Sequence, residues 1–208
     1  MPRASKEQSE ATARRVLATA TTLFAERGYA AVGLEEVAAA ADVTRGAVYH
    51  HYAGKMGLFE AVADAVAQRV GSAVAAAADA EPDPWAGLLA GCRAFLAAGV
   101  TDDTRRILLI DAPAVLGWQT WHGQDARASA RHLQDAIEAL AARGDVRVHS
   151  AAGTAALLSG AMNEAALRIA AAPDPASELE ILWRDLERLL SGLRPHALPD
   201  GADGHRTR

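Results

Sequence analysis

Residues 44–55, near the N-terminus, include side chains of the types that proteins use to contact DNA. An arginine can form two hydrogen bonds to the edge of a guanine, and hydroxyl or ammonium groups can bind phosphates. Thr44 also stands where a short helix is expected to begin, and a hydroxyl at a helix N-terminus suits a phosphate. Gly46 leaves room for close approach of a backbone or a base. The candidate DNA-binding residues are Thr44, Arg45, Gly46, Tyr49, His50 and Lys55.

A second group of side chains could hold a small molecule. Trp118, Trp121, His122 and Asp125 follow the spacing i, i+3, i+4, i+7, which places them on one face of a helix. Aromatic rings beside a few polar groups are typical of a ligand cavity. The alternative is that both tryptophans fill the core and His122 lies at its rim. Further candidates for the lining are Cys92, Phe95, Met162 and Asn163.

The same region permits a metal-binding interpretation. His122 and Asp125, and likewise His132 and Asp135, are three residues apart on one expected helix. Metal sites in helical bundles combine such motifs from two different helices with further glutamates, and no second helix here offers a partner motif. Solvated charge is therefore the better interpretation. No catalytic triad order, phosphate loop or nucleotide fingerprint stands out, so we expect no catalytic site, no cofactor and no metal.

The elements that must position these side chains are helices. The 208 residues include 51 Ala and 22 Leu, against 18 Val plus Ile, and only 5% are aromatic. Ala and Leu favour helices, whereas strand formers are scarce, which predicts an all-α fold. Periodicity, capping residues and Gly or Pro breaks indicate about nine helices. They are expected at about 5–27, 34–41, 45–51, 55–79, 85–99, 102–112, 118–143, 150–172 and 177–192. Asp102 or Asp103 is expected to cap the sixth helix, and Pro113 and Gly117 to interrupt the chain after it. Ser177 is expected to begin the last helix.

Charge and cysteine content exclude several classes of protein. The net charge of −5 argues against a uniformly basic nucleic-acid binder, but the first 55 residues carry +1 and the acidic excess lies beyond them. The single cysteine, Cys92, excludes a disulfide framework and a Cys-based zinc site. No apolar stretch reaches the roughly 18 residues of a membrane helix, and the N-terminus has no apolar signal-peptide core. We expect a cytoplasmic protein without membrane contact.

The segment 34–52 predicts two short helices joined by a tight turn, which is a helix-turn-helix. Val37, Ala38 and Ala41 can face Val43 and Val48 across the turn, and small residues let the two helices cross closely. The second helix then presents a polar outer face, which suits the major groove. A plain helical hairpin without DNA binding is the alternative.

The motifs in this region resemble those of TetR-type transcriptional regulators. The resemblance covers about residues 10–66 and is carried by Leu23 to Tyr29, Val37-Ala38, the run from Ala41 to Tyr52, Lys55 and Leu58. It implies a three-helix DNA-binding head (1–54) and a larger helical body (55–193) for ligand binding and dimerisation. Residues 194–208 are rich in Pro, Gly, His and Arg, and this composition predicts a disordered tail. Gly33 stands where the family usually has Thr or Ser, so no phosphate contact is expected there.

The last two expected helices suggest self-association. In the family, two such helices from each of two chains form a four-helix bundle, and two-fold symmetry fits that arrangement. The alternative is that both helices serve only the core of their own chain. The predicted interface residues are small on the first helix and apolar on the second: Gly153, Ala156, Gly160, Ala161, Leu179, Leu182, Trp183 and Leu186.

Together these patterns predict a homodimeric, ligand-responsive regulator of transcription. We expect it to be a repressor that binds a palindromic double-stranded DNA operator and is released by a small-molecule effector. Two other functions remain open at this point. One is a helical enzyme or metal-binding bundle that uses His122, Asp125 and His132. The other is a helical interaction module that keeps the shape of the head without binding DNA.

Overall fold

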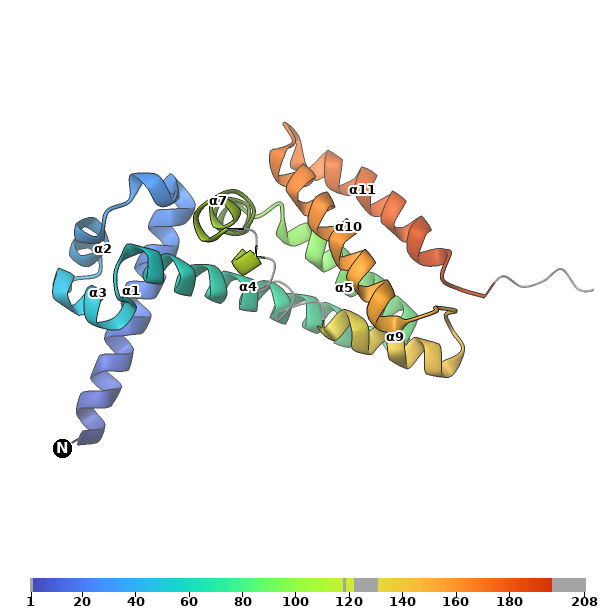
Figure 1. The fold of residues 1–208 in the computed structure, drawn as a ribbon, viewed down its shortest axis with the longest axis horizontal. Helices are drawn as coiled ribbons and strands as arrows, with labels where there is room; N and C mark the ends of the chain where they lie inside the picture. The colour runs from blue at the N-terminus through green and yellow to red at the C-terminus, as the bar shows by residue number, and fades with distance from the viewer. Residues whose placement is uncertain (1, 118, 122–130, 196–208) are drawn as a thin grey trace, which may run out of the picture.

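The computed structural model describes residues 2–117, 119–121 and 131–195, and every element in these ranges is helical (Figure 1). The predicted all-α fold is confirmed. The elements are α1 (Pro2–Ala31), α2 (Leu34–Ala40), α3 (Arg45–Tyr52), α4 (Lys55–Asp79), α5 (Pro84–Ala98), α6 (Asp102–Thr104), the π-helix η1 (Arg105–Asp111), α7 (Ala112–Leu116), α9 (Arg131–Arg143), α10 (Ala151–Ala171) and α11 (Pro175–Ser191).

Helices α1 to α3 form a head around the first turns of α4. Val16, Ala20 and Phe24 of α1 are fully buried, and Phe24 meets Phe59 of α4 edge to face at a centroid distance of 5.3 Å. Val37 of α2 and Val48 of α3 complete this core. The Tyr52 hydroxyl at the end of α3 donates a 2.7 Å hydrogen bond to the carbonyl oxygen of Ala13. The head is therefore held together by one continuous core and a cross-link from α3 to α1.

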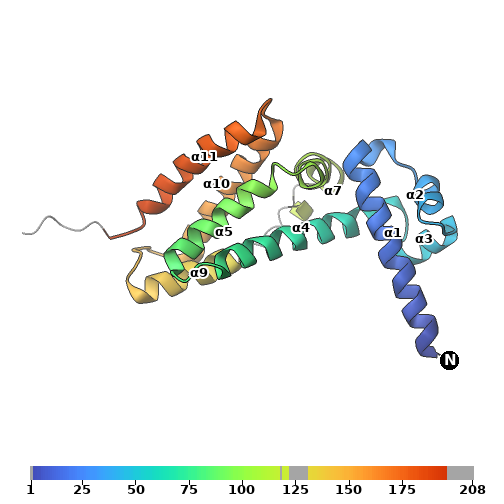
Figure 2. The same ribbon diagram turned by 180° about the vertical axis from the view of Figure 1, so that it is seen from behind.

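The long helix α4 leaves the head and runs into the body (Figure 1). Its 25 residues span about 37 Å. The far half of α4 packs on α5, and α5 in turn packs on α9, α10 and α11, as Figure 2 shows from behind. A second core forms among these body helices around Leu96, Ile137, Ile169 and Leu190. The head and the body thus have separate cores, and α4 connects them: its first half belongs to the head core and its far half packs on α5.

The segment after α5 differs from the expectation. The helix predicted to end before Pro113 continues from Asp102 to Leu116 as α6, η1 and α7. Its N-cap is Thr101 rather than Asp102 or Asp103. Pro113 does not interrupt it: Pro113 is the second residue of α7, directly after the π-helix. The break comes at Gly117, whose φ is 81°.

Other boundaries shift by a few residues. Helix α1 begins at Pro2 instead of residue 5, and the predicted break at Gly28 is a kink after which the helix resumes to Ala31. Asp174, not Ser177, caps α11: its carboxylate accepts the Ser177 amide hydrogen at 3.2 Å. Most of the first half of the predicted helix 118–143 and the expected tail from residue 196 onward fall outside the described residues.

Helices of the described ranges are too short or too polar to cross a lipid bilayer.

Candidate nucleic-acid interface and ligand cavity

The predicted helix-turn-helix is present at α2 and α3. The turn passes through Asp42, whose φ of 52° lies in the left-handed region. The amide of Val43 then donates back to the Ala38 carbonyl oxygen at 3.0 Å, which closes the end of α2. The exposed fractions of Val37 and Val48 are 1% and 0%, so both residues are buried where α2 and α3 cross, as predicted from the sequence. This packing leaves the other side of α3 facing solvent.

Thr44 is the N-cap of α3, and its Oγ1 accepts the Ala47 amide hydrogen at 3.2 Å. A hydroxyl has one donor and two acceptor positions, so its hydrogen remains available to a phosphate. Gly46 is exposed, and a Cβ built there would approach only Thr44 Oγ1, at 3.8 Å. Packing within the chain therefore does not require glycine at position 46.

Arg45 is exposed and pairs with Glu35 of α2, with 2.7 Å between Nη1 and Oε1. Sequence reasoning did not anticipate this partner. Both side chains are more than 60% exposed, so the pair contributes at most about 1 kcal/mol and can open in exchange for a base or a phosphate. Glu35 thus holds the arginine beside the outer face of α3.

Tyr49 and His50 also lie on the outer face of α3, with Tyr49 53% exposed. Lys55, at the start of α4, is half-buried and sits with its ammonium 4.2 Å from the centre of the Tyr29 ring. All six predicted DNA-binding residues are therefore on α3, at its N-cap or at the start of α4. Their contact with DNA remains a prediction.

A junction between head and body forms where the kink in α1 meets η1. Asp111 Oδ2 accepts the backbone amide hydrogen of Tyr29 at 2.7 Å and lies 3.4 Å from Nε of Arg106. Arg106 and Asp111 are five residues apart, which is the hydrogen-bond spacing of a π-helix, so η1 brings them together. The Arg106 guanidinium lies against Gly28, whose φ of 78° and ψ of 162° favour glycine. The head is thereby connected to the body through specific polar contacts as well as through α4.

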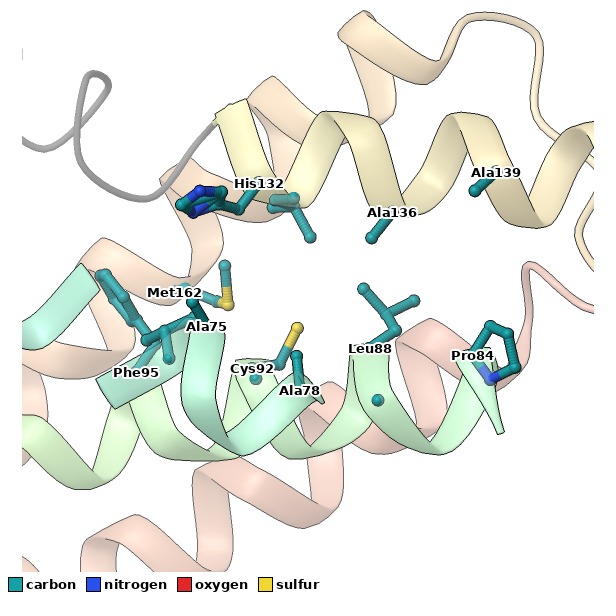
Figure 3. Close-up of a pocket in the computed structure, with 14 residues that line it drawn as sticks. Ala75, Ala78, Pro84, Leu88, Cys92, Phe95, His132, Ala136, Ala139 and Met162 are labelled. Carbon is teal, nitrogen blue, oxygen red and sulfur yellow. The ribbon is translucent and has the colours of Figure 1, made fainter. Parts of the chain in front are cut away.

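A cavity of about 220 Å³ lies between α4, α5, α9 and α10 (Figure 3). Its lining is apolar except for His132 at the start of α9 and the two sulfur-containing side chains of Cys92 and Met162. Burial raises the pKa of the Cys92 thiol to about 12, so the thiol is neutral at physiological pH. The lining residues are Val74, Ala75, Ala78, Pro84, Gly87, Leu88, Gly91, Cys92, Phe95, His132, Leu133, Ala136, Ala139 and Met162.

Three predicted ligand-binding residues, Cys92, Phe95 and Met162, line this cavity together. Asn163 is buried but does not line it, because it lies on a different side of α10 from Met162. Trp121 does not line it either: it is 4% exposed in the core shared with the head, as the core-filling alternative proposed. Trp118, His122 and Asp125 lie outside the described residues.

Sequence reasoning missed most of the cavity walls. His132 was considered only as a metal ligand, yet it lines the cavity. Among the described residues, no group of three or more His, Cys, Asp or Glu side chains could hold a metal ion. Small residues on α4, α5 and α9 form part of the walls, and α9 is far from α4 and α5 in sequence, so a single apolar face cannot show which other face it will meet.

The predicted dimer surface divides into two kinds of residue. Gly153, Ala156, Gly160 and Ala161 are exposed on one face of α10, together with Leu157, which is 79% exposed. The predicted residues of α11 face inward instead. Trp183 and Leu186 are buried in the core of their own chain, and Leu179 and Leu182 pack against it. The exposed apolar side chains of α11 are Ile181 and Leu189.

Comparison with known proteins agrees with the fold and with the resemblance noted in the sequence. A sequence profile described as "Bacterial regulatory proteins, tetR family" matches residues 16–62. A second, described as "Tetracyclin repressor-like, C-terminal domain", matches residues 85–193. The two matches cover the head with the start of α4, and the body from α5 to the end of α11.

Individual proteins match the chain over different lengths. A TetR-family transcriptional regulator from Pectobacterium atrosepticum is 34% identical, with a TM-score of 0.82, over 91% of this chain and 97% of that protein. RolR in complex with its ligand resorcinol has the same fold, with a TM-score of 0.67 and 19% identity over 93% of this chain and 100% of RolR. The regulator AcrR of Shigella flexneri is 32% identical over 110 residues, 52% of this chain, and the chain spans about half of its length. The chain belongs to the TetR family of bacterial regulatory proteins.

Proposed function

We propose that this protein is a ligand-responsive repressor of transcription that binds a palindromic operator as a homodimer and releases it when a small molecule binds the body. The observation that carries the proposal is the outer face of α3, where polar side chains and an exposed glycine stand together on a helix-turn-helix. The family consists of transcriptional regulators, which are not enzymes. This supports the regulator over the helical enzyme. We further propose a division into a head (1–54) and a body (55–193), and a cytoplasmic location.

The DNA-binding part of the proposal is tested by titrating operator DNA, selected from a random pool, in a mobility-shift assay. Arg45→Ala is expected to weaken binding by about 1–3 kcal/mol, or about 5- to 150-fold, if the arginine reads a base. Tyr49→Ala is expected to weaken binding by removing a hydroxyl available to a phosphate. Arg143→Ala is the matched control, since Arg143 is an exposed, ion-paired arginine in the body. Unchanged affinity in both head variants would contradict the assignment.

The exposed face of α10 supports the homodimer. Small residues at Gly153, Ala156, Gly160 and Ala161 allow a close approach of a second helix, and Leu157 stands among them. We propose that Ile181 and Leu189 of α11 extend this surface, while Trp183 and Leu186 support it from within.

Sedimentation tests the dimer surface. Leu157→Glu introduces a charge into the proposed interface and is expected to give monomers at micromolar concentration. Met56→Glu replaces a half-exposed apolar residue on α4, near the head and away from the proposed interface, and is the control that should sediment like the unchanged protein. If Leu157→Glu sediments like Met56→Glu and the unchanged protein, this face of α10 is not the interface.

The effector part of the proposal depends on coupling between body and head. A ligand can shift the DNA-bound population only by as much as it prefers one conformation of the body over the other. The junction at Gly28, Arg106 and Asp111 and the shared helix α4 are the physical connections through which such a preference could reach the head. The test is release of bound operator by candidate metabolites.

A further inference from the structure

We propose that the body cavity binds one unbranched alkyl chain of about eight to ten carbons, with the polar end of the ligand at His132. The proposal rests on the proposed function of the body as an effector-binding domain and names the chemical class of the effector. It is carried by the size, the shape and the polarity of the cavity.

The size of the cavity sets the number of ligand atoms. A dry cavity of about 150 Å³ accommodates benzene, which corresponds to roughly 25 Å³ for each of its six carbon atoms. At the same ratio, the 220 Å³ of this cavity suit about nine non-hydrogen atoms. A ligand of several fused rings would therefore have to leave much of itself outside.

The shape of the cavity favours a chain over a ring. The lining positions on α5 run from Pro84 to Phe95, a rise of about 16 Å, and Figure 3 shows these two residues at opposite ends. Spread over about 16 Å, the volume leaves a mean cross-section of about 14 Å². Non-bonded carbon atoms approach one another to about 3.5–4.0 Å, so a space this narrow is of the order of one alkyl chain wide and too narrow for two side by side.

Small residues create this narrow space. A Cβ built on Gly87 would come within 2.9 Å of the Ala78 carbonyl oxygen, so α4 and α5 approach closely along the floor of the cavity. Ala136 and Ala139 of α9 face this floor from the other side (Figure 3). Among the lining residues, the only rings are the Phe95 phenyl and the His132 imidazole, and both lie at the same end of the cavity (Figure 3), so a planar ligand that extends toward Pro84 would have no ring to stack on there.

Polarity gives the cavity a direction. His132 lies at the end that also holds Phe95 and Met162, whereas Pro84 lies at the other end (Figure 3). An imidazole can donate and accept hydrogen bonds, and it can therefore bind a carboxylate or a hydroxyl. The buried Cys92 thiol is neutral, so it does not repel an apolar tail and is not a nucleophile toward the ligand.

Calorimetric titration of the full-length protein without DNA tests the proposal. The probes are straight-chain carboxylates of six to fourteen carbons, the matching primary alcohols, and 2-naphthoate as a ring compound of similar size. Each added methylene is expected to tighten binding about fourfold until the chain fills the cavity at about eight to ten carbons, after which affinity levels off. The alcohols show whether the end group must be charged. Affinity that keeps rising to fourteen carbons, tighter binding of 2-naphthoate, or no binding of any chain would overturn the proposal.

Variants locate the binding site. Ala136→Leu narrows the cavity and is expected to weaken decanoate binding at least tenfold. Ala142→Leu, on the same helix but outside the lining, is the control. Ala139→Leu replaces Ala136→Leu if the latter does not fold. His132→Leu should weaken the carboxylates and His132→Gln should restore part of the affinity. If decanoate binds normally both to the folded alanine variant and to His132→Leu, the ligand lies elsewhere and the proposal is overturned.

Failure of this inference can be distinguished from failure of the proposed function. If the chain series binds as expected but does not release the operator, the ligand class stands and the regulatory proposal fails. If the operator is released by a compound of another class while no alkyl chain binds, the regulatory proposal stands and the ligand class is wrong.

Discussion

Substitution of Gly28 by alanine tests the junction between head and body. Gly28 has φ 78° and ψ 162°, a combination that residues with a Cβ almost never adopt. An added Cβ would also meet the guanidinium of Arg106. Arg106 would have to move, and its ion pair with Asp111 would be lost. The substitution therefore acts through two separable effects, one on the backbone and one on a side-chain pair.

The expected magnitude follows from these two effects. The unfavourable backbone conformation costs about 1–3 kcal/mol. Loss of the Arg106–Asp111 pair adds at most about 1 kcal/mol, because the arginine is 42% exposed and solvent screens the interaction. A total near 3 kcal/mol corresponds to a decrease in Tm of about 6–12 °C for a chain of this length. In an Arg106→Ala background only the backbone cost should remain, so the two substitutions are expected to be coupled by about 1 kcal/mol.

The assay is a double-mutant cycle by urea unfolding at one fixed protein concentration, since the proposed dimerisation would make stability depend on concentration. Gly144→Ala is the matched control: Gly144 also has φ 78°, but an added Cβ there would meet nothing within 4 Å. Equal costs of Gly28→Ala with and without Arg106 would refute the proposed contact. No cost in either background would refute the backbone conformation itself.

Three further predictions concern the head and the cavity. Gly46→Ala is expected to stabilise the fold by about 0.5 kcal/mol, because alanine favours helix and has room at this position, yet to weaken operator binding about tenfold, which thermal unfolding and mobility shift can measure separately. Glu35→Gln releases Arg45 and removes a negative charge beside it, so operator affinity should rise about two- to fivefold at low salt, and this gain should shrink at high salt. A decrease in operator affinity would show instead that Glu35 positions the arginine for DNA. Burial raises the pKa of the Cys92 thiol to about 12, so the thiol should react with iodoacetamide at pH 8 roughly a thousandfold more slowly in the folded protein than in urea. Because the folded pKa exceeds the unfolded one, the contribution of this thiol to stability is present below about pH 9 and is lost as the pH rises toward 12.

The head could be predicted in detail because its determinants are local. The crossing of α2 and α3 depends on small apolar residues within twelve positions, and the cap at Thr44 depends on an amide three residues away. Contacts of this range follow from helical periodicity and capping rules alone. Arg45 pairs with Glu35 across the turn, and spacing alone does not predict which of several nearby carboxylates the arginine will pair with.

The body was predictable only as a set of helices. An amphipathic helix shows which of its faces is apolar but not which partner covers that face. Trp121 illustrates this limit, because its place in the core beside the head depends on η1 and α7, whose π-helical turn has no sequence signal that we could identify. Leu179, Trp183 and Leu186 illustrate it again: their stripe on α11 fits a dimer interface as well as the interior of one chain, and the structure uses it for the interior.

The sequence by itself determined the helical class of this protein, most of its helix ends and the polar outer face of α3, since each of these depends on residues that are close together along the chain. Tertiary structure alone decided where the cavity lies, which side of α10 stays exposed, and how Asp111 of η1 reaches the amide of Tyr29 across 82 residues. These features arise from contacts between helices far apart in sequence, and many apolar faces are chemically equivalent until packing selects their partners.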